Sequence, residues 1–477
     1  MRDKGERKKG KRKIAGKIIC ILQLVISAVF LVILFTSHLL PTRYFLAVTV
    51  ILLGLFGFCF AWQFAGKGAR IFSGFISVLV SVGLIFGSFY LVKATKLMED
   101  VGGATYKTDN MVVVVKVDDP AQTLEDAKNY RFGIQTTLDQ ENNALMLADM
   151  EEQLGREPMT VEHVTIQEEA QALLDGTVEA AVYNEAFTDV IEETIEGYSD
   201  QVRILYQYGI ETQLETEETS VREPFNVYIS GIDVAGSITT NSRSDVNIIM
   251  TVNPNTKEIL LTTTPRDYYV ELPGVSGGQK DKLTHAGIYG VDVSMATLEQ
   301  LYDTNISYYA RVNFTSLVKI VDALGGVDVE SEYDFTIGEY SFNEGTNHLN
   351  GEEALAFSRA RKNFASGDRQ RGKNQEAVLT AILKKAMSPA ILKNANEIIA
   401  SVSDSVETNM TKDEMTEFIN MQLEDPTMYS IESQAADGTG STQKCYSSGD
   451  SLLYVMYPDE TLLGQLKQKM QDVLATE

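Results

Sequence analysis

The chain has 477 residues, 44% of them hydrophobic, so it is long enough for more than one domain. Its 41 Lys and Arg against 66 Asp and Glu give a net charge of −25, which argues against non-specific nucleic-acid binding because phosphate backbones would be repelled. Three cysteines and four scattered histidines offer no disulfide framework and spell no zinc site.

The N-terminal hundred residues are predicted to anchor the chain in a membrane. A basic segment, 1–17, precedes apolar stretches at about 18–37, 44–64 and 71–92, each near the roughly 20 residues that span a bilayer. A cleaved signal peptide is the alternative for the first stretch, but two more spans follow and no small-residue cleavage site is evident. The basic tail should stay in the cytoplasm, so residues after about 93 should lie outside the cell.

Residues 101–215 are predicted to form a small α/β accessory domain. The β-like runs MVVVVKV, RFGIQTT and EAAVYN alternate with acidic helix-like runs. The pattern carries no catalytic signature and favours a spacer or interaction domain. A polar linker is expected at 216–224.

A larger α/β domain is predicted over 225–477, with a central sheet flanked by helices. Strands are expected at 225–233, 244–253 and 257–265, and the turn-rich stretch 433–450 is expected to be a loop. Helices are expected at 293–302, 314–323, 351–361, 372–387 and 460–475. The predicted fold class is α/β, behind three transmembrane helices over 18–92.

Charged side chains stand where these strands start or end. Asp233 follows the first strand, Arg243 and Asp245 open the second, and Arg266 and Asp267 follow the third. Ligands of α/β sheets bind beyond strand ends. These residues therefore suggest a site that holds an anion together with a cation.

The segment SRARKNFASGDRQRGKNQEA, 358–377, gathers cations in an otherwise acidic chain. Arginine presents a planar fork of donors that suits phosphate oxygens, and a pyrophosphate needs several such forks. Five arginines could supply them: Arg243, Arg266, Arg359, Arg361 and Arg371. The alternative is surface salt bridging and turn capping by the neighbouring acids.

Three carboxylates are candidates for chemistry. Asp233 and Asp245 could hold Mg²⁺ together with phosphate oxygens, since this ion prefers hard oxygen ligands. Asp368 should be ionised among its cationic neighbours and could accept a proton from an attacking sugar hydroxyl. A structural ion pair with Arg371 is the alternative for Asp368. Phosphoryl transfer by positioning, metal and arginine needs no nucleophile elbow or Walker loop, and neither motif is present.

Residues about 225–390 resemble the LytR-CpsA-Psr family through six motifs in order. They are FNVYISGID, SRSDVNIIMTVNP, LTTTPRDYYVELPG, DKLTHAGIYG, HLNGEEALAFSRARK and GDRQRGKNQ. Three spans and an accessory domain make the chain most similar to the streptococcal capsule-associated branch. The family pattern often has an arginine where Asn374 stands, and commonly has Asn in the motif that reads Thr284-His285 here.

The resemblance implies a membrane-anchored phosphotransferase that moves a glycopolymer, such as capsular polysaccharide, from an undecaprenyl-pyrophosphate carrier onto peptidoglycan, using Mg²⁺ or Mn²⁺. Asp233 and Asp245 match the metal carboxylates, and Asp368 matches the proposed base. Lys282 matches a motif lysine of less certain role, counted here with the pyrophosphate ligands. The remaining pyrophosphate ligands implied are Arg243, Arg266, Arg359, Arg361, Arg371 and Gln375, with Arg266 and Arg371 also catalytic.

A lipid substrate requires an apolar channel, which helices 314–323 and 375–387 could provide, although such stripes are also typical of a plain core. Two other functions stay open. Water could replace the sugar hydroxyl, which would make the protein a polyprenyl pyrophosphate phosphatase. It could instead be a regulatory or scaffold protein that contacts other capsule-synthesis proteins. The internal tail of about 17 residues is too short for a DNA-binding domain.

Overall fold

The computed structural model describes residues 2–214, 219–232, 240–361, 363–364, 368–386 and 406–475, except the side chains of 2–14, 314, 368 and 369. Its internal contacts divide the chain into two units. The first comprises residues 1–102 with 410–428, and the second comprises 103–409 with 429–477.

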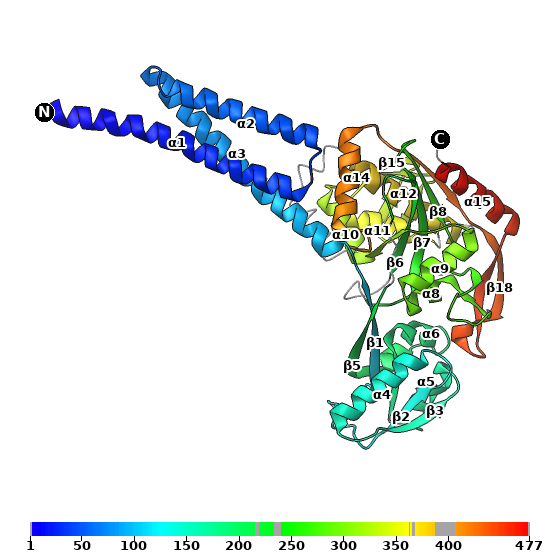
Figure 1. Cartoon of the computed structure of the whole chain (residues 1–477). Coiled ribbons are helices and arrows are strands. Elements are labelled where there is room, and N and C mark those ends of the chain that lie inside the picture. Colours follow the sequence, from blue (N-terminus) through cyan, green and yellow to red (C-terminus); the bar gives the residue numbers. More distant parts are fainter. Residues whose placement is uncertain are drawn as a thin grey trace. The chain divides into compact units, whose positions relative to one another are not determined.

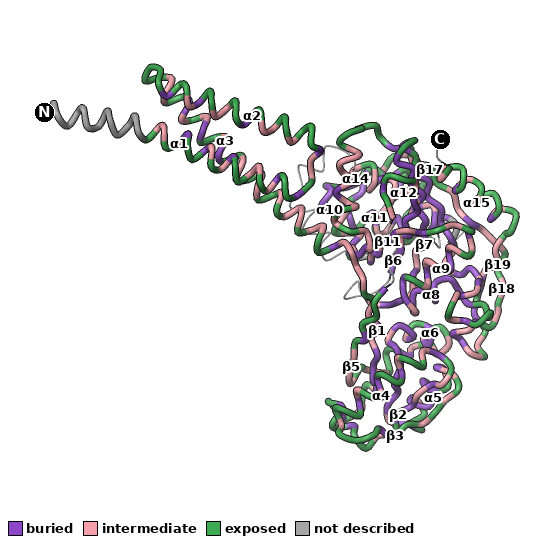
Figure 2. The backbone as a smooth tube through the Cα atoms, viewed as in Figure 1, coloured by how far each residue is buried: buried purple, intermediate pink, exposed green. Residues whose placement is uncertain are grey.

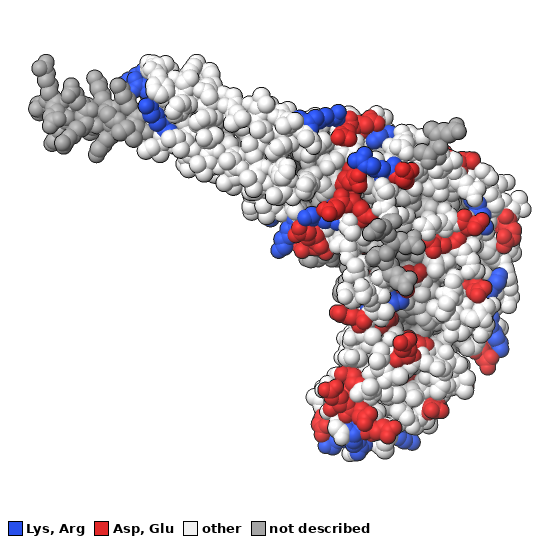
Figure 3. All heavy atoms as spheres, in the orientation of Figure 1, with Lys and Arg blue, Asp and Glu red and all other residues white. Residues whose placement is uncertain are grey.

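The first unit is built on three long apolar helices, α1 (Arg2–Ser37), α2 (Thr42–Trp62) and α3 (Lys67–Val101), as Figure 1 shows. Their candidate spans, Ala15–Ser37, Thr42–Trp62 and Lys67–Val101, are long and apolar enough to cross a bilayer, which confirms the three predicted stretches. The middle of these helices is free of charged side chains on the face shown in Figure 3. On α3, Ser73 and Ser77 are fully buried, because such small side chains let helices approach closely.

Helix α14 (Lys412–Glu424) belongs to this first unit although it lies more than 300 positions further along the chain. Its ends are tied to the ends of all three long helices. Lys412 pairs with Glu99 at 3.0 Å, Asn420 donates to the carbonyl of His38 at 2.8 Å, and Arg43 donates to the carbonyl of Glu424 at 2.9 Å.

The second unit begins with an accessory lobe, residues 103–214, around a five-stranded sheet of order β3-β2-β4-β1-β5. The apolar run Met111–Val115 is buried on both faces of this sheet, in two separate cores. The strands are β1 (Tyr106–Lys116), β2 (Arg131–Gln135), β3 (Met159–His163), β4 (Ala180–Asn184) and β5 (Val202–Gln213). The helices are α4 (Gln140–Leu154), α5 (Ile166–Leu174), the 3-10 turn η1 (Glu185–Phe187), α6 (Thr188–Glu192) and α7 (Tyr198–Gln201).

The remainder of the second unit forms a larger lobe around a six-stranded sheet of order β16-β11-β6-β7-β8-β17. Strands β6 and β7 are largely buried, as the purple segments of Figure 2 show. The strands are β6 (Phe225–Ile232), β7 (Ser244–Asn253), β8 (Glu258–Thr263), β11 (Tyr308–Asn313), β16 (Val406–Thr408) and β17 (Ser430–Ala435).

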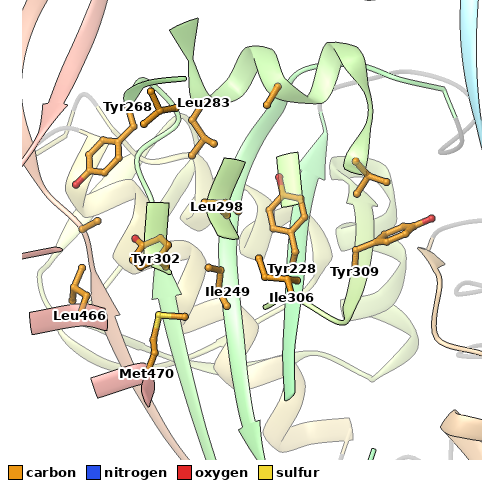
Figure 4. Packing of buried hydrophobic residues seen from close by; sticks show 14 of the residues in the cluster. Tyr228, Ile249, Tyr268, Leu283, Leu298, Tyr302, Ile306, Tyr309, Leu466 and Met470 are labelled. Atoms are coloured by element: carbon orange, nitrogen blue, oxygen red, sulfur yellow. The ribbon is translucent and has the colours of Figure 1, made fainter. Parts of the chain in front are cut away.

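Helices cover both faces of this sheet, which confirms the predicted α/β fold class. On one face, side chains of α8 (Leu283–Tyr289), α9 (Val291–Tyr302) and α15 (Glu460–Leu474) pack against Tyr228, Ile249 and Leu260 (Figure 4). On the other lie α10 (Phe314–Ala323), α11 (Gly351–Arg359) and α12 (Asp368–Ala386). Helix α11 begins where its sequence predicts, because Asn350 and Glu353 form a capping box.

Small hairpins and a short turn complete the lobe, and one of the hairpins corrects an expectation. The stretch 433–450, expected to be a loop, contains the end of β17, all of β18 (Gly438–Lys444) and η3 (Tyr446–Ser448). β18 has no apolar pattern of its own; pairing along β19 (Leu452–Pro458), whose Val455 is buried, makes it a strand. The other hairpin strands are β9 (Tyr269–Glu271), β10 (Lys280–Lys282), β12 (Val327–Ser331), β13 (Phe335–Ile337), β14 (Tyr340–Phe342) and β15 (Gly345–Leu349).

Candidate active site

Antiparallel pairing of β7 and β8 brings Asp245 and Arg266 together. Ile248 of β7 pairs with Thr263 of β8. Asp245 lies three positions before Ile248 and Arg266 lies three positions after Thr263, so both lie at the same edge of the sheet. Arg266 Nη1 donates to Asp245 Oδ1 at 2.9 Å, and Thr284 Oγ1 donates to the same oxygen at 3.3 Å. Both charged side chains are mostly buried, so the pair is screened less by water than a surface ion pair.

Three guanidiniums from separate segments surround Asp245. Burial would raise the pKa of this carboxyl, but the positive charges of Arg266, Arg243 and Arg371 outweigh it and hold the pKa below its ordinary value. Asp245 is therefore ionised at neutral pH. The three arginines enter from the end of β8, the start of β7 and the first turn of α12.

A small polar pocket lies where these residues meet. It has a volume of about 20 Å³, roughly that of one water molecule. A Cβ on Gly372 would come within 3.0 Å of Thr263, so glycine lets α12 lie this close to β8. The pocket is lined by Asp245, Asn247, Thr263, Thr264, Pro265, Arg266, Arg371, Gly372, Gln375, Ala435 and Ala436.

An apolar cavity of about 350 Å³ lies between the sheet and helices α10 and α12. Gln375 lines both this cavity and the small polar pocket. Of the expected channel residues, Leu317, Val378, Leu379, Ile382 and Leu383 line the cavity. Val321 belongs to a neighbouring core with Phe357, and Val378 of the cavity lining belongs to that core as well, so these apolar faces also serve plain packing.

Two cations of the predicted set, Arg243 and Lys282, form ion pairs with the accessory lobe. Arg243 donates from Nε to Asp189 at 3.0 Å and from Nη1 to Glu193 at 2.7 Å. Lys282 donates to the other oxygen of Glu193 at 2.8 Å and lies 3.6 Å from Asp267. Sequence reasoning missed Asp189 and Glu193, because nothing distinguishes them from the many other acids of that region.

The other predicted site residues either are exposed or lie outside the part of the chain that the structure describes. Arg359 and Arg361 are exposed at the C-terminal end of α11. Asp233 lies outside the described residues, and Asp368 begins α12 with a side chain that is likewise not described. Among the described residues no group of three or more His, Cys, Asp or Glu could hold a metal ion. Of the two proposed metal carboxylates, only Asp245 can be placed.

The two departures from the family pattern have structural roles. Asn374 is buried, donates to the carbonyl of Phe357 at 3.1 Å and so joins α12 to α11. His285 is fully buried with Nδ1 2.6 Å from Asp281, whose second oxygen accepts from the amide of Ser447 at 2.9 Å. Burial would raise the pKa of Asp281, but His285 and these hydrogen bonds hold it below the ordinary value.

Comparisons with known proteins identify the family of the chain. The model of the LytR_cpsA_psr family matches residues 191–471. The polyisoprenyl-teichoic acid–peptidoglycan teichoic acid transferase TagU of Bacillus mycoides is 37% identical over 203 residues, 42% of this chain and 66% of that protein. The match thus spans just under two thirds of that relative.

For two further relatives, the match extends over a larger share of the relative's own length. The TagU of Enterococcus faecalis is 33% identical over 260 residues, 54% of this chain and 82% of that protein. The crystal structure of B. subtilis TagV is 28% identical, covers 53% of this chain and 98% of that one, and superposes with a TM-score of 0.45.

Proposed function

Because the chain belongs to the LytR_cpsA_psr family, we propose that it is a transferase that moves a glycopolymer from a polyprenyl-diphosphate carrier onto peptidoglycan. One observation carries the proposal: Gln375 lines both a pocket that contains Arg266 and Arg371 and an apolar cavity. The pocket is smaller than a diphosphate, so the phosphates would contact its arginines from outside it. Phosphates at these arginines and a prenyl chain in the cavity would match a lipid carrier in charge and polarity at both ends.

The proposed reaction is a phosphoryl transfer to a sugar hydroxyl. The hydroxyl oxygen of peptidoglycan forms a new bond to the phosphorus that bears the glycopolymer, and the bond from that phosphorus to the bridging oxygen breaks. Polyprenyl phosphate leaves, and Asp368 takes the hydroxyl proton. Arg266 and Arg371 donate to the phosphate oxygens, which stabilises the charge that builds up there.

Mg²⁺ or Mn²⁺ is proposed as the cofactor. Asp245 offers a hard, ionised carboxylate at the edge of the pocket, which fits such an ion, with Asp233 as the second ligand. When bound, the ion would neutralise phosphate charge. Arg266 already holds one oxygen of Asp245, so Asp245 would present its other oxygen to the metal.

The proposed location is the cell membrane, with the basic tail inside and both lobes outside. The three apolar helices support an anchor, and the basic first residues support this orientation. Added protease should then degrade the lobes on intact protoplasts while sparing the tail. The polymer favoured by the three spans and accessory lobe is a capsular polysaccharide, whereas the relatives' names specify teichoic acid.

A reconstituted transfer assay tests the proposal. The full chain in detergent is given a polyprenyl-diphosphate-linked oligosaccharide and a peptidoglycan glycan acceptor. Arg266→Ala should abolish transfer, whereas Arg131→Ala, which removes an exposed ion pair with Glu179 in the accessory lobe, should not. Hydrolysis of the diphosphate at the same rate with and without the glycan acceptor would favour a phosphatase. No turnover, with Arg266→Ala functional in cells, would favour a scaffold.

A further inference from the structure

We infer that the accessory lobe supplies Asp189 and Glu193 to the head-group site, where their carboxylates compete with substrate phosphates for Arg243 and Lys282. The inference rests on the proposed function, because it assumes that a diphosphate binds beside Asp245. It goes further by giving the accessory lobe a part in substrate binding.

The contacts occupy the donor atoms that a phosphate would use. Glu193 bridges two cations, accepting from Arg243 at 2.7 Å and from Lys282 at 2.8 Å, while Asp189 takes Nε of Arg243 at 3.0 Å. The Lys282 side chain is only 7% exposed and that of Glu193 is 24% exposed. Charge-assisted bonds of this length in a partly dry setting are among the stronger hydrogen bonds in proteins.

Glu193 is ionised in this arrangement. Burial would raise the pKa of its carboxyl, but electrostatic interactions with His285, Lys282 and Arg243 outweigh burial and lower the pKa. The carboxylate is thus a full negative charge beside two cations of the site. It resembles in charge and acceptor geometry one oxygen pair of a phosphate.

The described side chains of the site are balanced in charge. Its cations are Arg243, Arg266, Arg371 and Lys282, and its carboxylates are Asp189, Glu193, Asp245 and Asp267. A diphosphate adds negative charge to this balanced set. Release of Glu193 and Asp189 from the cations would restore the attraction that the substrate needs.

The lobes stay joined without these two acids, so the competition can be tested alone. Lys107 of β1 pairs with Asp292 at 3.0 Å, and Asn241 donates to Asp109 at 2.9 Å. Just before α6, buried Phe187 packs edge to face on Tyr289 with ring centroids 5.8 Å apart. Substitution of Glu193 therefore removes a carboxylate from the site and keeps the interface around it.

Binding of inorganic pyrophosphate to the full chain in detergent, measured by calorimetry at fixed ionic strength, tests the inference. Glu193→Gln should bind about tenfold more tightly than wild type, the effect of losing one competing charged hydrogen bond. Glu193→Asp keeps the charge and should bind close to wild type. Asp292→Asn, which loses the ion pair of Lys107 between the lobes, should bind like wild type.

The outcomes separate this inference from the proposed function. If Arg266→Ala binds pyrophosphate as well as wild type, the head-group site is wrong and the function proposed above falls with it. If Arg266→Ala loses binding but Glu193→Gln binds no tighter than wild type, only the competition is overturned. Hydrogen exchange gives a second reading: pyrophosphate should speed exchange of amides 188–193 in wild type, and unchanged or slower exchange would refute displacement.

Discussion

Glu376 on α12 gives a stability prediction whose size follows from the structure. The residue is 4% exposed, and Oε1 of its carboxyl has no hydrogen-bond partner. Burial raises the pKa from 4.5 to about 7. Because the folded chain holds this proton more tightly than the unfolded chain, the stabilisation is complete below pH 4.5 and is lost as the pH rises through about 7.

The magnitude is on the order of 3 kcal/mol, because one pKa unit corresponds to about 1.4 kcal/mol. Glu376→Gln has the shape of the protonated acid and should be no less stable than wild type at pH 5, and more stable by up to that amount at pH 8. Thermal unfolding of the full chain, followed by near-ultraviolet circular dichroism, measures the difference. Glu330→Gln, an exposed acid on β12, is the control and should change little at either pH.

The effect of Glu376→Gln on stability should therefore differ between pH 5 and pH 8. An equal effect of Glu376→Gln at pH 5 and pH 8, or a loss of stability confined to pH 8, would refute the claim that Glu376 is buried in its neutral form.

Three other predictions concern the site. Leu379→Trp should fill the apolar cavity and weaken binding of a long prenyl diphosphate at least tenfold, whereas Thr380→Trp on the other face of α12 should not; equal losses in both would argue against a lipid channel. Asp245→Asn should lower transfer more than a hundredfold, and wild-type transfer should show no loss from this group as the pH falls to 5, because the neighbouring guanidiniums hold its pKa below the ordinary value. Chelation of divalent ions should stop transfer and Mg²⁺ should restore it; full activity in the chelator would contradict the metal role.

The strands and the pairing of Asp245 with Arg266 could be predicted from sequence, because local patterns carry that information. The runs 244–253 and 257–265 have strand chemistry and the turn NPNT between them, so their outer ends must meet. The same reasoning places the start of α11, through its capping box. Arg371 was recognisable from its cationic segment and from the family motif GDRQRGKNQ.

What the sequence did not reveal depends on contacts distant in the chain. Glu193 meets Lys282, 89 positions away, and no local pattern marks it among so many acids. α14 joins the three long apolar helices through residues more than 300 positions apart. β18 becomes a strand only because β19 pairs with it. In each case a tertiary contact decides the outcome where the local signal is weak.

A structure of the full chain bound to a short prenyl diphosphate tests the central claim most directly. The account predicts that the phosphates lie within hydrogen-bond distance of the Arg266 and Arg371 guanidiniums beside Asp245, with the prenyl chain in the cavity lined by Leu379 and Ile382. A diphosphate bound elsewhere on the chain, with Arg266 still donating to Asp245, would contradict it.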